Sequence, residues 1–195
     1  MMKNIIQTQA KQSLIMSVNS YSKKLIAIVT TLTLLSSCSL EASEKNQELT
    51  DANIAAIVVG ANNIDISAGE IALKRSKNDE VRKFARTMIN DHTAVLNAAV
   101  ALVTKLGVIP VNNDLVAALS AQSQSHEEKL KTLTGNAFDK SYIDHEVAYH
   151  KAVIEVIETQ LIPSAKNQEL KNMLVHVLPA FRAHLKHCEM IQSNI

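Results

Sequence analysis

The chain has 195 residues, and its 20 Lys and Arg residues nearly balance 19 Asp and Glu residues, for a formal net charge of +1. With no marked excess of positive charge and no basic stripe, the sequence indicates no nucleic-acid partner. The whole chain has only four glycines and three prolines, which favours long uninterrupted helices over strands joined by turns.

The first predicted element is an export signal. Lys23 and Lys24 precede a continuous apolar run over residues 25–35, which is short for a membrane span of about 20 residues. Residues 35–38 then read Leu-Ser-Ser-Cys, which is similar to the lipobox at which bacterial lipoproteins are cleaved and lipidated. We therefore predict lipidation of Cys38. An ordinary signal peptide and an uncleaved anchor are the alternatives.

These features predict three segments: a lipoprotein signal peptide over residues 1–37, a lipidated cysteine with a polar tether over 38–49, and a helical domain over 50–193. Ser39 follows the cysteine, and by similarity to lipoprotein sorting in enteric bacteria this favours the outer membrane, with the domain facing the periplasm. If the lipobox is not used, the expected location is periplasmic.

Amphipathic patterns after the tether predict four long helices and one polar helix. The predicted ranges are 51–75, 79–106, 114–133, 137–161 and 167–191, with Asp51 as the first N-cap, Gly107 as a C-cap and Pro163 ending the fourth helix. Pro179 should bend the last helix, because it cannot donate to the carbonyl of Val175. The fold predicted is an all-α, ferritin-like four-helix bundle, with the polar third helix as an additional peripheral or crossover helix.

One ionisable side chain interrupts the apolar face of each long helix. These are Asp65, His92, His150 and His184, and Glu146 precedes His150 by one turn. Counted along the helices, the first three fall at similar depths, whereas His184 falls a turn or more away unless its helix bends. We keep His184 in a shared site only if its ring lies within about 8 Å of the other two rings, because zinc–nitrogen bonds are about 2.0–2.1 Å long.

Two interpretations of this cluster stay open. Imidazole and carboxylate groups suit one transition-metal ion, such as zinc, copper, nickel or iron. Alternatively, the histidines pair with Asp65 or Asp91 in a polar network that fixes the helix register. The Glu-x-x-His pattern of ferritin-like di-iron sites does not occur, so we expect no ferroxidase activity.

Other groups carry weaker signals. Cys188 lies on an apolar helix face and is predicted to be a buried, inert thiol. His126, His145 and His176 have no partner pattern and are expected to be exposed, and His187 is expected to face outward.

Three motifs in order resemble a known bacterial family. They are VRKFA leading to MINDHT (residues 81–93), GNAFDKSY (135–142) followed by His150, and LPAFRAHL (178–185). Over residues 50–192 the chain resembles domain-of-unknown-function family four-one-four-two, whose members are often labelled outer-membrane proteins. The resemblance implies an exported ferritin-like bundle and implies no reaction. The glutamate usual on the family's first helix is here Asp65, a shorter side chain.

The function expected from the sequence is that of a lipid-anchored protein of the cell envelope. Because no catalytic triad, glycine-rich phosphate loop or haem-attachment motif occurs, we predict a non-enzymatic protein that binds a partner or protects the envelope. The lipid anchor would make the membrane its one defined partner, and the sequence names no protein partner. The alternative is a protein that holds one transition-metal ion between its helices.

Overall fold

The computed structural model describes residues 49–195, so the predicted signal peptide, Cys38 and most of the predicted tether lie outside the described residues. The long helices are α2 (Asp51–Arg75), α3 (Asp79–Leu106), α4 (Asp114–Thr132), α5 (Gly135–Val156) and α7 (Gln168–Gln192). A π-helical turn, η1 (Ile157–Leu161), and the short α6 (Ile162–Ser164) continue α5. Within residues 49–195 there is no β-strand.

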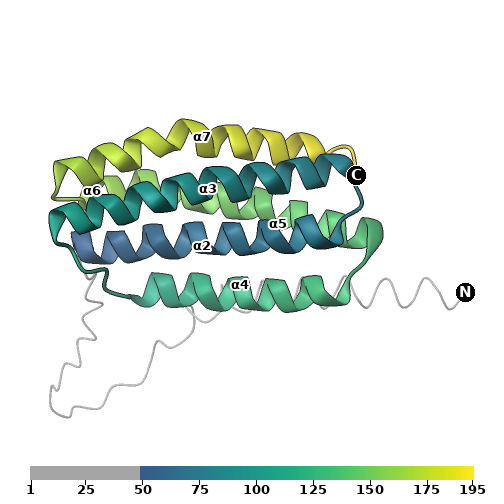
Figure 1. The fold of residues 1–195 in the computed structure, drawn as a ribbon, viewed down its shortest axis with the longest axis horizontal. Helices are drawn as coiled ribbons and strands as arrows, with labels where there is room; N and C mark the ends of the chain where they lie inside the picture. Colours follow the sequence, from purple (N-terminus) through teal and green to yellow (C-terminus); the bar gives the residue numbers. More distant parts are fainter. Residues whose placement is uncertain (1–48) are drawn as a thin grey trace, which may run out of the picture. The chain divides into compact units, whose positions relative to one another are not determined.

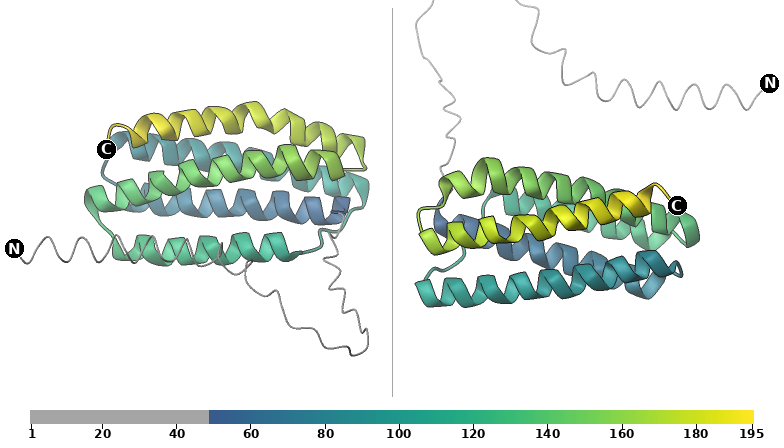
Figure 2. Two further views of the ribbon diagram at one scale, coloured as in Figure 1. Left: turned by 180° about the vertical axis from the view of Figure 1, so that it is seen from behind. Right: turned by 90° about the horizontal axis from the view of Figure 1, so that it is seen from above.

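The helices form a bundle with a single long crossover. Figure 1 shows that α2 and α3 run in opposite directions, and that α4 then returns along the outside of the bundle. The α5 and α7 helices follow as a second antiparallel pair, and Figure 2 shows α4 on the side away from α7. The four core helices are thus ordered up-down-down-up, as in ferritin-like folds. The prediction of an all-α bundle with a peripheral crossover helix is confirmed.

The N-cap of α2 lies one residue earlier than predicted, at Thr50, which forms a capping box with Asn53. The Thr50 hydroxyl accepts the Asn53 N–H, and the Asn53 side chain accepts the Thr50 N–H. The prediction of Asp51 as N-cap is therefore wrong. Its carboxylate instead accepts the backbone N–H groups of Lys166 and Asn167, which joins the start of α2 to the start of α7.

The prediction that Pro163 ends the fourth helix at Leu161 is also wrong. The chain stays helical to Ser164, because the backbone widens into η1 just before the proline and Pro163 falls in the first turn of α6. A proline in a regular α-helix collides with the carbonyl four residues earlier, and a π turn alters that spacing. The helical segment that carries His150 therefore extends three residues further at its C-terminal end than predicted.

The last helix, α7, continues through Pro179 without a break. Figure 1 shows it bowed along its length. Val175, whose carbonyl loses its helical partner to the proline, is 51% exposed. The bend predicted at Pro179 is thus gradual, and it lies on the solvent side of the helix.

The core consists of two apolar clusters, one toward each end of the bundle. The first includes Ile54, Ile57, Ile154, Leu161 and Leu174, and the second includes Phe84, Met88, Phe138, Tyr142 and Cys188. On each core helix one ionisable residue lies between the stretches that feed the two clusters: Asp65, His92, His150 and His184. The bundle therefore has a polar layer between two apolar ones.

The central helix α2 is long and apolar enough to cross a membrane by length and composition alone, but over half of its most apolar stretch is buried inside the bundle. It approaches α3 closely at Gly69. A Cβ atom at Gly69 would lie 3.0 Å from Cγ1 of Ile89 and 3.1 Å from the carbonyl oxygen of Ala85. At Gly60, on the same helix, the nearest atom would be Cγ1 of Val116 at an ordinary 3.5 Å.

The surroundings of these two glycines predict that substitution by alanine has opposite effects on stability at the two positions. Gly69→Ala should lower the free energy of unfolding by about 1–3 kcal/mol, because the added methyl group overpacks the α2–α3 contact. Gly60→Ala, the matched control, should raise it by up to about 1 kcal/mol through helix propensity. Urea unfolding followed by circular dichroism measures both. The packing argument fails if Gly69→Ala is at least as stable as Gly60→Ala.

Candidate metal centre

The predicted site residues meet at one depth in the bundle. The depth of each residue can be measured as the number of residues from one end of the bundle. At this end α2 and α7 begin and α3 and α6 stop. Asp65 is 14 residues from Asp51, His92 14 from Leu106, His150 14 from Ser164, and His184 16 from Gln168. At about 1.5 Å per residue these positions agree to about 3 Å. The expected offset of His184 from the other three residues is therefore wrong.

The three imidazole rings pack around one point. Ring centroids are 5.7 Å apart for His92 and His150, 5.4 Å for His92 and His184, and 5.5 Å for His150 and His184. One nitrogen from each ring lies within 4.8 Å of the other two, and ligand atoms of Asp65, Glu146 and His150 meet the same limit. His184 thus passes the distance test set for it above. All five side chains are buried.

The protonation of His92 is fixed by Asn62, a residue that the sequence analysis did not single out. The Asn62 amide nitrogen donates to the carbonyl of Val58 at 2.7 Å, so its oxygen must face His92 Nδ1, 2.9 Å away. An amide oxygen only accepts hydrogen bonds, and His92 Nδ1 therefore carries the proton. The lone pair of His92 is left on Nε2, which is buried and has no hydrogen-bond partner within residues 49–195.

The other two histidines are held in the same manner. His150 Nδ1 donates to the backbone carbonyl of Glu146 at 3.0 Å, which leaves its lone pair on Nε2. His184 Nε2 donates to the carboxylate of Asp91 at 2.9 Å, which leaves its lone pair on Nδ1. Both free nitrogens are buried, and neither has a hydrogen-bond partner in the described part of the chain. An acceptor behind each ring that orients a nitrogen lone pair is the arrangement of metal-binding histidines.

Asp65 completes the donor set. No N–H or hydroxyl group of a described residue donates to either of its carboxylate oxygens, although the side chain is fully buried, and its hydrogen-bonding neighbour is the Glu146 carboxyl group. Its Oδ2 lies 3.2 Å from His92 Nε2 and 3.6 Å from His150 Nε2. Two ligands about 2.0–2.1 Å from a tetrahedral ion lie about 3.4 Å apart, so these spacings match a shared ion. Without a proton or a cation between them, the facing lone pairs would repel one another.

Burial keeps the histidines neutral and raises the pKa values of the carboxyl groups. Desolvation lowers the pKa of His92 to about 2 and that of His150 to about 4, and it also lowers the pKa of His184. Desolvation raises the pKa of Asp65 to about 7. Burial and then the nearby Asp65 charge raise the pKa of Glu146 well above its usual range. At neutral pH the site thus offers three neutral imidazoles, which are ready metal ligands.

The remaining sequence predictions have mixed outcomes. His176 is exposed and Cys188 is buried, as predicted, and burial raises the pKa of the Cys188 thiol to about 12. His126 and His145 are not exposed. They are half-buried and stacked with ring centroids 3.8 Å apart, because α4 lies over α5 there. His187 is half-buried against the ring of Phe84 rather than facing outward.

Comparison with known proteins identifies the family and the fold. The model of the family described as "Domain of unknown function (DUF4142)" matches residues 36–191, in agreement with the motifs in the sequence. No curated protein matches the chain. A Streptomyces coelicolor protein described as secreted, DUF305, has a similar structure, with a TM-score of 0.63, 13% identity, and coverage of 74% of this chain and 92% of that one.

Two structures of the protein CopM are also similar. The Cu(II)-bound form has a TM-score of 0.58 and 19% identity over 74% of this chain and 98% of that one. An Ag-bound form has a TM-score of 0.59 and 18% identity over 75% and 97%. At these identities the likeness establishes the shared helical fold alone.

The low pKa values of the buried histidines predict that the metal-free protein loses stability in acid. An unfolded histidine takes up a proton near pH 6.5, whereas His92 and His150 stay neutral in the fold down to about pH 2 and 4. His126 and His145 add two more histidines whose pKa values burial lowers to about 4. Between pH 6.5 and 4 these histidines make the unfolded chain bind more protons, so stability falls as pH falls.

The buried carboxyl groups oppose this trend without reversing it. Because burial raises the pKa of Asp65 to about 7 and raises that of Glu146 well above its usual range, both groups hold protons in the folded state that the unfolded chain has lost over much of this pH range. Two carboxyl groups offset part of the effect of four histidines, so urea unfolding should show a positive net slope of stability from pH 4 to 6.5. His92→Leu should reduce that slope by up to about 1.4 kcal/mol per pH unit. A flat or negative slope in the unsubstituted protein would show that the histidines are protonated when folded.

Proposed function

The chain belongs to the DUF4142 family, and we propose that it binds one transition-metal ion through His92, His150, His184 and Asp65. The observation that carries this proposal is the convergence of three imidazole nitrogens, each aimed inward by an acceptor behind its ring, on the buried Asp65 carboxylate, which lies 3.2 and 3.6 Å from two of them. A polar network that served structure alone would be expected to satisfy these buried atoms. A bound cation would satisfy all four at once.

The donor set favours a divalent first-row ion. Imidazole nitrogen and carboxylate oxygen suit Zn(II), Cu(II), Ni(II) and Fe(II), and the affinity of such sites generally peaks at Cu(II). The same general fold occurs in CopM in its Cu(II)-bound form, which supports copper as the first ion to test. Glu146, 3.6 Å from His150 Nδ1, would act as an outer neutral carboxyl group beside the ligands.

We further propose that the protein holds its ion without catalysis. Three histidines and one aspartate fill the four positions of a tetrahedral ion, whereas catalytic sites of this kind keep one position open for water or substrate. The ligand side chains are at most 6% exposed, which leaves little room for a substrate. The protein would then sequester a metal ion rather than use it.

The proposed place of this activity is outside the cytoplasm. The predicted lipoprotein signal, with Cys38 as the lipidated residue, supports attachment to the outer membrane on the periplasmic side. The structural likeness to a DUF305 protein described as secreted is consistent with export. Sequestration of transition metals at the envelope would be one form of the protective role that the sequence analysis favoured.

Metal binding predicts one equivalent of ion per chain. Elemental analysis after loading with Cu(II) or Zn(II) should give one ion, and an excess of 100-fold over the dissociation constant should raise the free energy of unfolding by about 2.7 kcal/mol. His92→Ala should abolish both effects, whereas His176→Ala, on the exposed face of α7, should change neither. The proposed site would be ruled out if the metal content were substoichiometric and the unsubstituted protein melted identically with and without each ion.

The role of Asn62 predicts a second, weaker effect. Asn62→Leu keeps a side chain of similar size but removes the acceptor that holds the proton on His92 Nδ1. Loss of such an outer partner typically lowers metal affinity by about 10–100-fold, so the variant should bind one ion more weakly. Competition with a chelator of known affinity measures the change. Affinity equal to that of the unsubstituted protein would mean that Asn62 does not orient His92.

A further inference from the structure

One hydrogen bond joins the buried cluster to an exposed carboxylate. His184 Nε2, on α7, lies 2.9 Å from Oδ2 of Asp91, on α3, and the Asp91 side chain is 49% exposed. The side chains of Asp65, His92 and His150 are only 0–3% exposed, and that of His184 is 6% exposed. On the α3–α7 side, the cluster is therefore one side chain away from an anionic group in solvent.

We propose that Asp91 is the entrance and positioning residue of the metal centre. Its carboxylate would attract a divalent cation from solvent to the α3–α7 side, and its bond to His184 would keep that ring's Nδ1 turned inward to receive the ion. This inference rests on the metal binding proposed above. If ions enter past Asp91, His184 is the first buried ligand that an entering ion meets and the last that a leaving ion contacts.

The physical case has two separable parts. A half-exposed carboxylate keeps its charge in water, and fields of this kind raise the association rates of oppositely charged ligands at low salt. The same carboxylate accepts the Nε2 proton of His184, which selects the tautomer with a free Nδ1. Asp91→Asn removes the charge but leaves an oxygen that can accept this proton. Asp91→Leu removes both the charge and the acceptor.

These variants, made in the full chain, separate attraction from positioning. Binding of Cu(II) can be followed by stopped flow through quenching of tyrosine fluorescence, and release can be followed after addition of a strong chelator. Asp91→Asn should slow association about fivefold to tenfold at low ionic strength, with the difference shrinking in high salt and one ion still bound at equilibrium. Asp91→Leu should also weaken affinity by about 10–100-fold and speed release.

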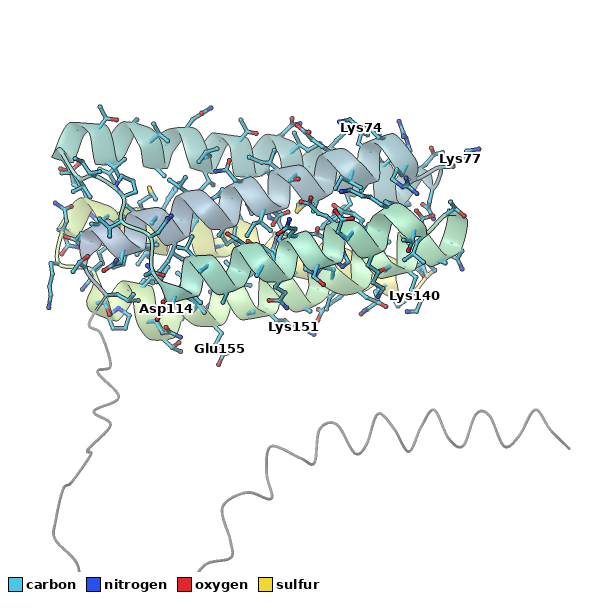
Figure 3. All side chains as sticks on the ribbon, turned by 90° about the horizontal axis from the view of Figure 1, so that it is seen from below. Lys74, Lys77, Asp114, Lys140, Lys151 and Glu155 are labelled. Atoms are coloured by element: carbon cyan, nitrogen blue, oxygen red, sulfur yellow. The ribbon has the colours of Figure 1, made fainter. Side chains whose placement is uncertain are left out.

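Glu155→Gln provides the matched control. Glu155 is exposed, and Figure 3 shows it on the outer side of α5, pointing away from the bundle. This substitution changes the net charge by the same amount as Asp91→Asn, so it should leave the association rate unchanged. Urea unfolding of each metal-free variant establishes that the rates come from folded protein.

The outcomes distinguish this inference from the proposed function. If both Asp91 variants associate with and release copper at the rates of the unsubstituted protein while one ion is bound, Asp91 is not the entrance, and the metal site stands. Equal slowing by Glu155→Gln would likewise overturn the inference, because the effect would then be one of net charge. Failure of the unsubstituted protein to bind any transition metal would overturn both proposals.

Discussion

The structure depends on an unfavourable arrangement at its centre: electron-rich atoms of buried side chains face one another. Burial of a polar group without a hydrogen bond costs free energy, and burial of an unpaired charge costs more. Here the carboxylate of Asp65 faces the unprotonated nitrogens of His92 and His150 at 3.2 and 3.6 Å. The apolar clusters on either side must hold this layer together. A cation would turn the same arrangement from a cost into a stabilising contact.

The helices and the members of the polar layer could be predicted from the sequence because both follow local rules. Apolar residues recur with the helical period, and a histidine or aspartate that keeps this period must face the core. This reasoning placed Asp65, His92, His150 and His184 in the interior. The end of α3 could be predicted as well, because glycine favours the left-handed conformation that ends a helix. Gly107 adopts this conformation, with φ 64°.

The parts that could not be predicted depend on long-range or unusual backbone geometry. A π turn such as η1 has no periodic signature, so the helical residues from Ile162 to Ser164 were not predicted. Asn62 looks like one more small polar residue in α2, and its role appears only once α3 packs alongside. The pairing of His184 with Asp91 joins residues 93 positions apart. Local spacing indicates which side chains face the interior, but the packing of the helices determines which of them form a pair.

The crossover helix α4 divides the four core helices into two antiparallel pairs, and the donor residues are divided equally between them. Asp65 and His92 belong to the α2–α3 pair, and His150 and His184 belong to the α5–α7 pair. A bound ion would therefore act as a cross-link between two halves of the chain that are each held together by local contacts. Because this cross-link forms only after the halves dock, it should act mainly on the rate of unfolding and leave the rate of folding nearly unchanged. The ion would then determine how long the bundle lasts rather than how fast it forms.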